Sequence, residues 1–319
     1  MNLFATVLTY PAPSANYRGE SEQNRTIIQK ITDGRFEYPV ISPEAMRNAL
    51  REILASYGLP CNRSRLHDEE QLAVKFTKYP YPEEYADDFF FGYMVAAKTE
   101  ERKKILEKIK TEKRSHSFHF KRDSVLRMNL AKSLEPYRHD SLLTQSPKHS
   151  EDSPWQNAEG SALLHRETVQ TAFQYPFALN LNECGSKTFK RKRESGDGNA
   201  NGLEFLLKAI GELNGVSGNH ARSYYEMAPA SIIIRLSESL VAGYNTYGFT
   251  KDGDFPEVIE GILKEDYPGN EFYIGGKIVK DMADDKRNVL QENRVTLDRN
   301  AQRLIATVTV RILGEENAS

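Results

Sequence analysis

The sequence has few cysteines, the residues on which disulfide and redox chemistry depends. Its two cysteines, Cys61 and Cys184, lie far apart and outside any metal-binding or redox motif. Such usage argues against a disulfide framework and fits a reducing cytosol. No apolar run approaches transmembrane length, and the first residues lack the basic region and cleavage site of a secretory signal. We therefore expect a soluble, cytoplasmic protein with no membrane partner.

Motifs of the common catalytic classes are also missing. The sequence has no nucleophile elbow, histidine dyad or dinucleotide fingerprint. The GSKT sequence at 185–188 resembles the end of a phosphate-binding loop, but Gly and Lys are not adjacent and the upstream glycine is absent. His116 and His119 have no strong third ligand nearby, so solvated histidines are favoured over a metal pair. We expect a binding protein without catalytic residues, metal or cofactor.

Two pairs of adjacent aspartates are interpreted as structural. Asp87 and Asp88 are predicted to guard the edge of a strand, and Asp284 and Asp285 to begin a helix. Both interpretations are favoured over a two-metal site.

Apolar residues are scarce as well. The hydrophobic share is 39% with tyrosine counted and the charged share is 28%, which indicates an elongated or insertion-rich shape, or much surface given to partners. Because the net charge is only −2, a nucleic-acid surface would require segregated charge. Residues 98–122 hold ten Lys and Arg against four acids, or +6, and residues 251–285 hold four against ten, or −6. Phosphate binding on one side would produce this pattern, and so would ordinary charged helices.

One helix is predicted with particular clarity. Ser42 is a good N-cap and Pro43 suits the first helical position. Apolar residues then recur at helical spacing until Gly58 ends the helix. Arg47 and Arg51 are four residues apart and share a face.

The rest of the chain alternates between strands and helices. Strands are predicted at 3–10, 87–97, 171–181 and around 232–234, and further helices at 203–213 and 255–263. Pro176 implies an edge strand or a bulge, residues 186–202 read as a basic, Gly-rich connection, and residues 303–313 fit either a strand or a helix. The order strand, helix, strand, insertion, strand, helix, strand is the βαββαβ pattern of ferredoxin-like α+β domains. Their open sheet is also an RNA-recognition platform.

The stretch from Asn219 to Gly248 combines binding chemistry with a rigid base. A loop with His220, Arg222, Tyr224 and Tyr225 runs directly into three successive isoleucines. The isoleucine run predicts a central strand covered on both faces. Cationic donors and flat rings at the mouth of a buried strand suit single-stranded nucleic acid. The alternative is an ordinary loop with half-buried tyrosines.

Several short segments, taken in order, resemble the DevR-like RAMP backbone subunit of the type I-B CRISPR Cascade interference complex. None is a strong motif alone, but their joint order over roughly residues 1–250 is specific. They are residues 14–19 (SANYRG), 42–51 (SPEAMRNALR), 121–124 (KRDS), 133–136 (SLEP), 165–167 (HRE), 173–177 (FQYPF) and 220–225 (HARSYY).

The resemblance implies a right-hand-like shape with an RRM-like palm and inserted finger and thumb elements. It places the first part of the palm with its finger insertion at 1–135, a thumb at 136–166, the second part of the palm at 167–250 and a C-terminal extension at 251–319. Copies would stack along a CRISPR guide RNA into a helical filament, together with other Cascade subunits. Bases not displaced by the thumb would pair with target DNA.

Site residues follow from the same resemblance. Cationic and polar residues of the palm and insertions would contact RNA: Asn16, Arg18, Arg25, Arg47, Arg51, Arg122, Arg127, Arg166, His220 and Arg222. The thumb wedge would be Leu142, Leu143, Leu163 or Leu164. For each arginine the alternative is a surface charge that contributes little to stability.

Two other functions stay open. Related RAMP subunits of type III complexes cut target RNA with an acidic residue of a palm loop, and Asp33, Asp123 or Glu20 is the candidate here. The type I-B likeness argues against this ribonuclease. The other alternative is a stand-alone regulatory RNA-binding protein.

Overall fold

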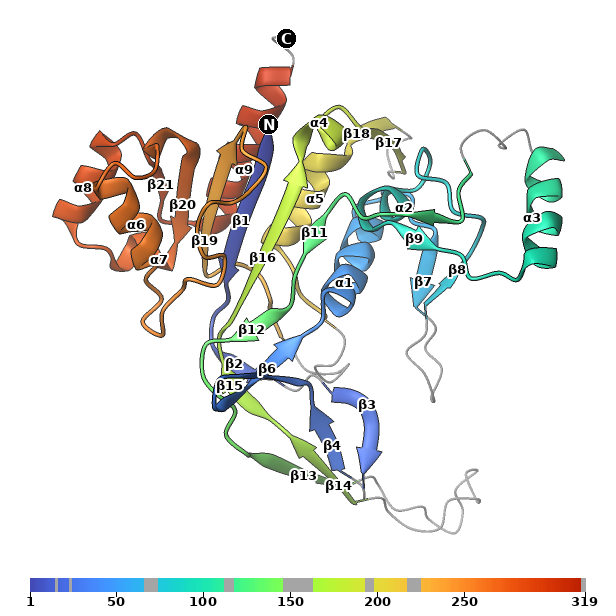
Figure 1. Cartoon of the computed structure of the whole chain (residues 1–319), viewed down its shortest axis with the longest axis horizontal. Coiled ribbons are helices and arrows are strands. Elements are labelled where there is room, and N and C mark those ends of the chain that lie inside the picture. Colours follow the sequence, from blue (N-terminus) through green and yellow to red (C-terminus); the bar gives the residue numbers. More distant parts are fainter. Residues whose placement is uncertain are drawn as a thin grey trace.

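The computed structural model describes residues 1–14, 17–22, 25–65, 74–111, 118–145, 163–192, 198–216 and 225–316. A nine-stranded sheet lies at its centre (Figure 1). From one edge to the other its strands are β21 (Thr296–Asp298), β20 (Phe272–Gly276), β19 (Ser231–Ser237), β1 (Asn2–Leu8), β16 (Phe173–Asn180), β12 (Ala131–Ser133), β6 (Phe36–Ile41) and β5 (Lys30–Asp33), with β11 (Arg127–Met128) also paired to β16. None of the described helices is both long and apolar enough to cross a membrane.

Part of this sheet and two helices form a ferredoxin-like unit, here called the palm. In chain order it consists of β1, α1 (Pro43–Ser56), β11 with β12, β16, α5 (Gly202–Gly211) and β19. The strands lie in the order β19-β1-β16-β12, and each neighbouring pair is antiparallel. A βαββαβ chain with this strand order is the ferredoxin-like arrangement. The predicted α+β fold with an RRM-like palm is therefore confirmed.

Alternation along the strands decides which residues meet the helices. In β16, Phe173, Tyr175, Phe177 and Leu179 share one core with alternate residues of β1 and with α1 and α5, as their spacing predicts. The first helix also follows its prediction: Ser42 Oγ accepts a hydrogen bond from the backbone N–H of Ala45 at 3.2 Å.

Pro176 lies in the interior of the sheet and not at an edge. Its strand is paired with β1 on one side and with β11 and β12 on the other. The carbonyl of Pro176 accepts from Asn129 N at 3.2 Å, so the missing N–H faces the break between β11 and β12. Because neither β11 nor β12 pairs with Pro176 at this break, the sheet loses no hydrogen bond by having a proline there.

The palm face opposite the helices is partly covered, contrary to the open platform expected from the fold. Residues 244–249 cross this face, where Thr6 Oγ1 donates to Thr246 O at 3.0 Å and Phe249 N donates to Gln174 Oε1 at 3.1 Å. Thr6 and Gln174 are buried as a result. Bases cannot stack on the middle of this sheet as they do on an open RNA-recognition platform.

The C-terminal part of the chain extends the palm. Strands β20 and β21 continue the sheet beyond β19 (Figure 1). A second core joins this extension to its helices, which are α6 (Pro256–Leu263), α7 (Lys277–Asp281) and α8 (Asp284–Glu292), with a 3-10 turn at Gly269–Glu271. The predictions of a helix at 255–263 and of a helix start at Asp284 are confirmed.

The ambiguous segment at 303–313 is part of helix α9 (Ala301–Glu316). Leu304, Ile305, Val308 and Ile312 recur at helical spacing and are buried in the same core as α5. The helix packs on β20 where Gly275 lets the side chain of Leu304 come close.

An insertion between α1 and β11 forms an arm at one side of the palm (Figure 1). Its elements are β7 (Arg63–Arg65), β8 (Val74–Phe76), α2 (Ala86–Phe91), β9 (Tyr93–Met94), α3 (Thr99–Thr111) and β10 (Lys121–Arg122). The prediction of a strand at 87–97 is wrong, because residues 86–91 form a helix with Asp87 and Asp88 in its first turn. Gly92 then takes a φ of 62°, which separates this helix from β9.

Two segments distant in sequence form a separate four-stranded sheet below the palm, here called the thumb sheet (Figure 1). Its strands lie in the order β13 (Ser141–Gln145), β14 (Leu163–Glu167), β4 (Arg25–Ile28) and β3 (Tyr17–Glu22). A short pair, β2 (Ala12–Ser14) with β15 (Val169–Thr171), connects it to the palm. Most of the described residues between β1 and β5 are therefore β-structure.

The basic connection predicted at 186–202 is also more regular than expected. It contains a hairpin of β17 (Thr188–Arg191) and β18 (Gly198–Asn201), which follows the short helix α4 (Leu181–Cys184). Phe189 of the hairpin is buried against Phe89 and Phe90 of α2. The hairpin therefore packs the arm onto the palm.

Candidate nucleic-acid interface

Arg47 is a predicted site residue whose described surroundings leave part of its cation open to an anion. Its side chain on α1 is 20% exposed, Nη2 donates to Leu126 O at 3.3 Å and Nη1 lies 3.9 Å from Glu44 Oε1. Its Nε is buried without a hydrogen-bond partner among the described residues. Burial lowers the pKa of Arg47 from its ordinary value, and an arginine stays charged regardless. A phosphate would meet the exposed part of this guanidinium, since Nε itself is buried.

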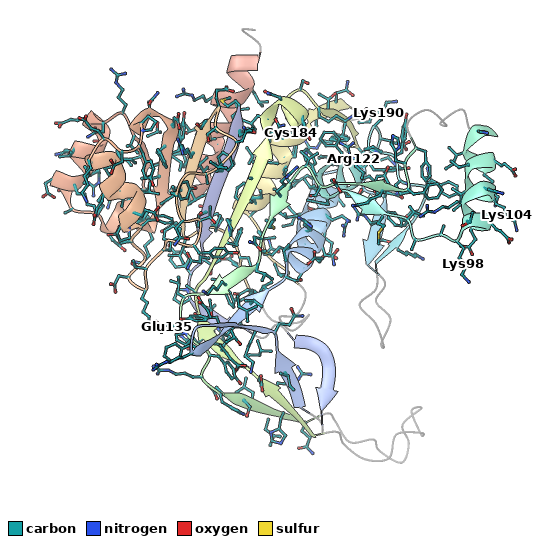
Figure 2. The ribbon with its side chains drawn as sticks, in the orientation of Figure 1. Lys98, Lys104, Arg122, Glu135, Cys184 and Lys190 are labelled. Atoms are coloured by element: carbon teal, nitrogen blue, oxygen red, sulfur yellow. The ribbon has the colours of Figure 1, made fainter. Side chains whose placement is uncertain are left out.

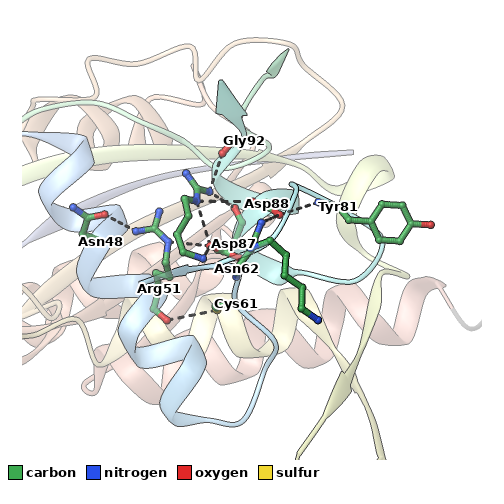
Figure 3. A network of polar contacts seen from close by, with 10 residues as sticks. Asn48, Arg51, Cys61, Asn62, Tyr81, Asp87, Asp88 and Gly92 are labelled. Carbon is green, nitrogen blue, oxygen red and sulfur yellow. Dashed lines mark hydrogen bonds and ion pairs between the residues drawn. The ribbon is translucent and has the colours of Figure 1, made fainter. Parts of the chain in front are cut away.

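Arg51 does not fit its predicted role. Although it shares a helix with Arg47, its side chain is buried and Nε donates to Asp87 Oδ2 at 3.1 Å (Figure 3). Nη1 donates to Asn48 Oδ1. Burial lowers the pKa of Arg51 and the charge of Arg63 lowers it further. A buried guanidinium already held by a carboxylate stabilises the arm and cannot reach phosphate in this arrangement.

Arg63 is not among the predicted site residues, yet it completes the buried network around Asp87. Its Nε lies 3.2 Å from Asp87 Oδ2, and Nη2 donates to Asp87 O and Gly92 O at 2.9 and 2.8 Å. The backbone N–H of Asn62 donates to Asp87 Oδ1 at 2.7 Å. Asp87 therefore joins α1, β7 and α2. The signal in the sequence was an acidic pair inside an aromatic run, because a carboxylate buried there needs cationic partners.

Asp88 is buried in the same place but is held by amides. Its Oδ2 accepts from Asn62 Nδ2 and Tyr81 N, both at 2.9 Å. Burial, followed by the charge of Asp87, raises the pKa of Asp88 to about 6. The interpretation of these two aspartates as a strand-edge guard is therefore wrong, since both are fully buried.

Arg122 lies on β10, close to α2 (Figure 2). Its guanidinium carbon is 5.1 Å from the centre of the Phe89 ring, and its Nε is buried with no hydrogen-bond partner in the described part of the chain. Stacking on a ring leaves the edge of a guanidinium open to an anion. Arg122 therefore remains a candidate contact.

Arg127 lies on the opposite face of the palm from the helices. It is in register with Ala178, which is in register with Phe4, whereas Leu3 and Leu179 belong to the helix-side core. Residues directly opposite each other in a sheet share a face. Arg127 therefore lies on the other face of the sheet from the helix that carries Arg47, although Arg47 Nη2 donates to the carbonyl of the neighbouring Leu126.

The thumb sheet gathers other predicted residues. Strand β14 is parallel to β4, with His165 beside Arg25 and Arg166 beside Thr26. Leu142 and Leu143 of β13 are 58% and 62% exposed. For Arg18, Arg25, Leu163 and Leu164 only the backbone is described, and it lies in this sheet. Predicted RNA contacts and the predicted wedge thus meet in one element.

Three predicted contacts, Asn16, His220 and Arg222, lie outside the described residues. Tyr225, which follows His220 and Arg222 in the sequence, is buried, so its ring does not offer a stacking face. The isoleucine strand that follows is β19, buried on both faces between β1 and β20 as predicted.

The two candidate nuclease acids whose side chains are described, Asp33 and Asp123, have separate surroundings. Asp33 ends β5, and its carboxylate pairs with Lys132. Asp123 is 86% exposed and lies 3.5 Å from Lys121 Nζ. The side chain of Glu20 is outside the described set. Among described side chains, no group of three or more His, Cys, Asp and Glu is arranged to hold a metal ion.

Taken together, the palm, arm and thumb sheet define the class of RRM-like proteins with large insertions in a ferredoxin-like core. No protein-family model matches the chain. The "CRISPR-associated protein Cas7/Cst2/DevR" of Myxococcus xanthus (strain DK1622) is 26% identical over 301 residues, which is 91% of each chain. The resemblance to DevR-like proteins is therefore confirmed.

Two solved structures share the fold. One is a chain of a "CRISPR RNA-guided surveillance complex, pre-nicking", with a TM-score of 0.56 and 12% identity over 98% of this chain and all of that one. The other, from a "CRISPR RNA-guided surveillance complex", has a TM-score of 0.50 and 13% identity over 98% of this chain. The likeness therefore extends over the insertions as well as the palm.

Proposed function

We propose that this chain is a non-catalytic backbone subunit of a type I-B CRISPR Cascade complex in the cytoplasm. It binds guide RNA, forms a filament of copies along it, and presents the remaining bases for pairing with target DNA. Other Cascade subunits complete the assembly. The observation that carries the proposal is the likeness to the DevR relative over 91% of both chains.

Cations of the palm and of the arm support binding to a nucleic-acid backbone. Arg47 is 20% exposed and Arg122 is partly exposed, so both guanidinium groups can be reached from solvent. Cations of this kind neutralise phosphates without reading sequence. Guide pairing would then read the target, so the protein needs no base-specific contact.

Binding is tested with the purified chain and labelled single-stranded RNAs of unrelated sequence, titrated at several salt concentrations. Arg47→Ala should weaken binding to all of them equally, and the slope of log K against log salt should flatten by about 0.7, the value for one phosphate contact on a single strand. An unchanged slope would remove Arg47 from the interface.

Arg299→Ala is the matched control. Arg299 is exposed, and no hydrogen bond or ion pair of its side chain is seen within the described part of the chain. Its loss should leave both affinity and salt slope as they are. An equal effect of both variants would show that net charge alone, and not a site, governs binding.

A further inference from the structure

A cavity of about 200 Å³ opens on the palm at the end of its sheet where β1 begins (Figure 1). Asn2 of β1 and Asn180 of β16, which are in register there, both line it. Residues 244–249 cover the same sheet farther along, where they bond to Thr6 and Gln174. The end of the palm face is therefore accessible, although its middle is not.

The lining of the cavity includes an aromatic ring. Phe4 of β1 is only partly buried, and it lies in register with Ala178 of β16 on the face opposite the helices. In RRM domains, aromatic side chains on the open face of the sheet stack bases. The volume is well below the roughly 300–1,000 Å³ of pockets for drug-sized ligands, so the cavity suits one flat ring system and not a length of peptide.

A rigid turn after β19 forms an apolar wall of the cavity. Its Leu240 lines the cavity and is 88% exposed. Hydrogen bonds fix the turn, since Val241 N donates to Ser239 Oγ at 3.2 Å and Asn2 Nδ2 donates to Ser239 O at 2.9 Å. A flat ring placed on Phe4 would lie beside Leu240, and bases held by proteins stack between aromatic and apolar side chains in this way.

Arg127 supplies a cation to the same cavity. It is exposed, and no hydrogen bond or ion pair of its side chain is seen among the residues that the structure describes. An arginine can contact a phosphate through two parallel donors. Asn180 Nδ2 donates to Glu183 Oε1 at 3.1 Å, and this polar pair of the lining offers groups for the edge of a base. An aromatic ring, an apolar wall and an exposed cation together suit single-stranded nucleic acid.

The cavity lies close to Arg47, the predicted contact with a nucleic-acid backbone. Arg47 Nη2 donates to Leu126 O at 3.3 Å, and Arg127 follows Leu126 in the chain. Strand β11, which begins with Arg127, pairs only with β16 among the described strands. A polynucleotide held at Arg47 is therefore separated from the cavity by one short strand.

We propose that the cavity binds one unstacked base of a single-stranded nucleic acid, with the base on Phe4 and its phosphate on Arg127. The site goes beyond the proposed function, in which the chain contacts only the backbone of the guide, and does not require it. Because stacking accepts every base, the site adds affinity without sequence specificity. The same chemistry fits a base of the guide RNA and an unpaired base of the target DNA.

Photochemical crosslinking tests the site with the purified chain. The probes are a short single-stranded RNA and a DNA of the same sequence, each carrying one 5-iodouracil base, which crosslinks to aromatic side chains on which it stacks. Irradiation should attach at least one probe to Phe4, as mapped by mass spectrometry of the digested chain. A crosslink with RNA alone assigns the guide as the source of the base, and one with DNA alone assigns the target. Absence of a Phe4 crosslink from both mixtures overturns the proposal.

Phe4→Leu keeps an apolar side chain in β1 but removes the ring. It should weaken binding by roughly tenfold, the effect of losing one base–aromatic contact, and leave the salt slope unchanged. Phe36→Leu is the matched control, since Phe36 is 57% exposed on β6 and lies outside the cavity. Circular dichroism checks that both variants fold, and equal losses of affinity in the two would overturn the proposal.

Arg127→Ala, at an exposed position, tests the same site without touching the core. It should lower the yield of the Phe4 crosslink and flatten the salt slope by about 0.7, and an unchanged yield would count against the site. If Arg47→Ala leaves the slope unchanged while the Phe4 crosslink forms, the base site stands and the backbone contact of the proposed function fails. If Arg47→Ala flattens the slope and no probe crosslinks to Phe4, the backbone contact stands and the base site is overturned.

Discussion

At the scale of single residues, the network around Asp87 decides which arginines are available. Arg51 and Arg63 are held by one buried carboxylate, whereas Arg47, one turn earlier on the same helix, has no partner for its Nε among the described residues. Helical spacing predicts that Arg47 and Arg51 share a face, and it cannot predict which of them meets an aspartate 36 residues further along. That distinction depends on tertiary contacts.

Asp87→Asn should destabilise the chain strongly. Removing one partner of a buried ion pair leaves uncompensated charge, here on two arginines, and typically costs about 3–5 kcal/mol. Urea unfolding followed by circular dichroism measures the loss. Asp284→Asn is the control, since Asp284 is 86% exposed in its pair with Arg287 and such pairs contribute about 1 kcal/mol or less. Equal costs for the two variants would contradict the role assigned to Asp87.

Asp88 should make stability depend on pH. Its folded pKa of about 6 exceeds the ordinary value of 3.8, so the folded chain binds more protons between these values. Its contribution to stability is therefore largest below pH 4 and falls as pH rises through 4 to 6. Asp88→Asn keeps an acceptor for Asn62 and Tyr81 but cannot ionise. The cost of the substitution should be about 1 kcal/mol smaller at pH 7 than at pH 5, and a cost independent of pH would contradict this.

At the scale of elements, the sequence predicts those helices and strands that are defined by local signals. The helix at Pro43, the alternating strand β16 and the isoleucine strand β19 all follow from capping or periodicity. The thumb sheet could not be predicted, because β4 pairs with β14 across more than a hundred residues. The helix at 86–91 was mistaken for a strand because its aromatic run is buried and short runs of that kind fit either element.

Strand β13 of the thumb sheet should distort RNA without being needed for binding. Its exposed Leu142 and Leu143 are suited to insert between bases, whereas Arg47 and Arg122 lie elsewhere, beside α1 and α2. Trimming residues 141–160 should spare RNA affinity and change the spacing of reactive bases in chemical probing of the assembled complex. An unaltered pattern would show that another element displaces the bases.

At the scale of the whole molecule, charge is segregated along the longest axis. The basic stretch 98–122 includes α3, which contains Lys104 and directly follows Lys98, at the end of the arm (Figure 2). The acidic stretch 251–285 forms the lobe of α6, α7 and the start of α8 at the opposite end (Figure 1). This separation lets a chain with a net charge of only −2 approach a polyanion on one side.

The central claim is that this chain holds a polynucleotide by its backbone and leaves it intact. Mass analysis of RNA that co-purifies with the native assembly, before and after incubation with matched target RNA and magnesium, tests it most directly. The account predicts a guide RNA of defined length bound by several copies of the chain, and target RNA recovered whole. Absence of bound RNA, or target RNA cut into a regular ladder, would contradict it.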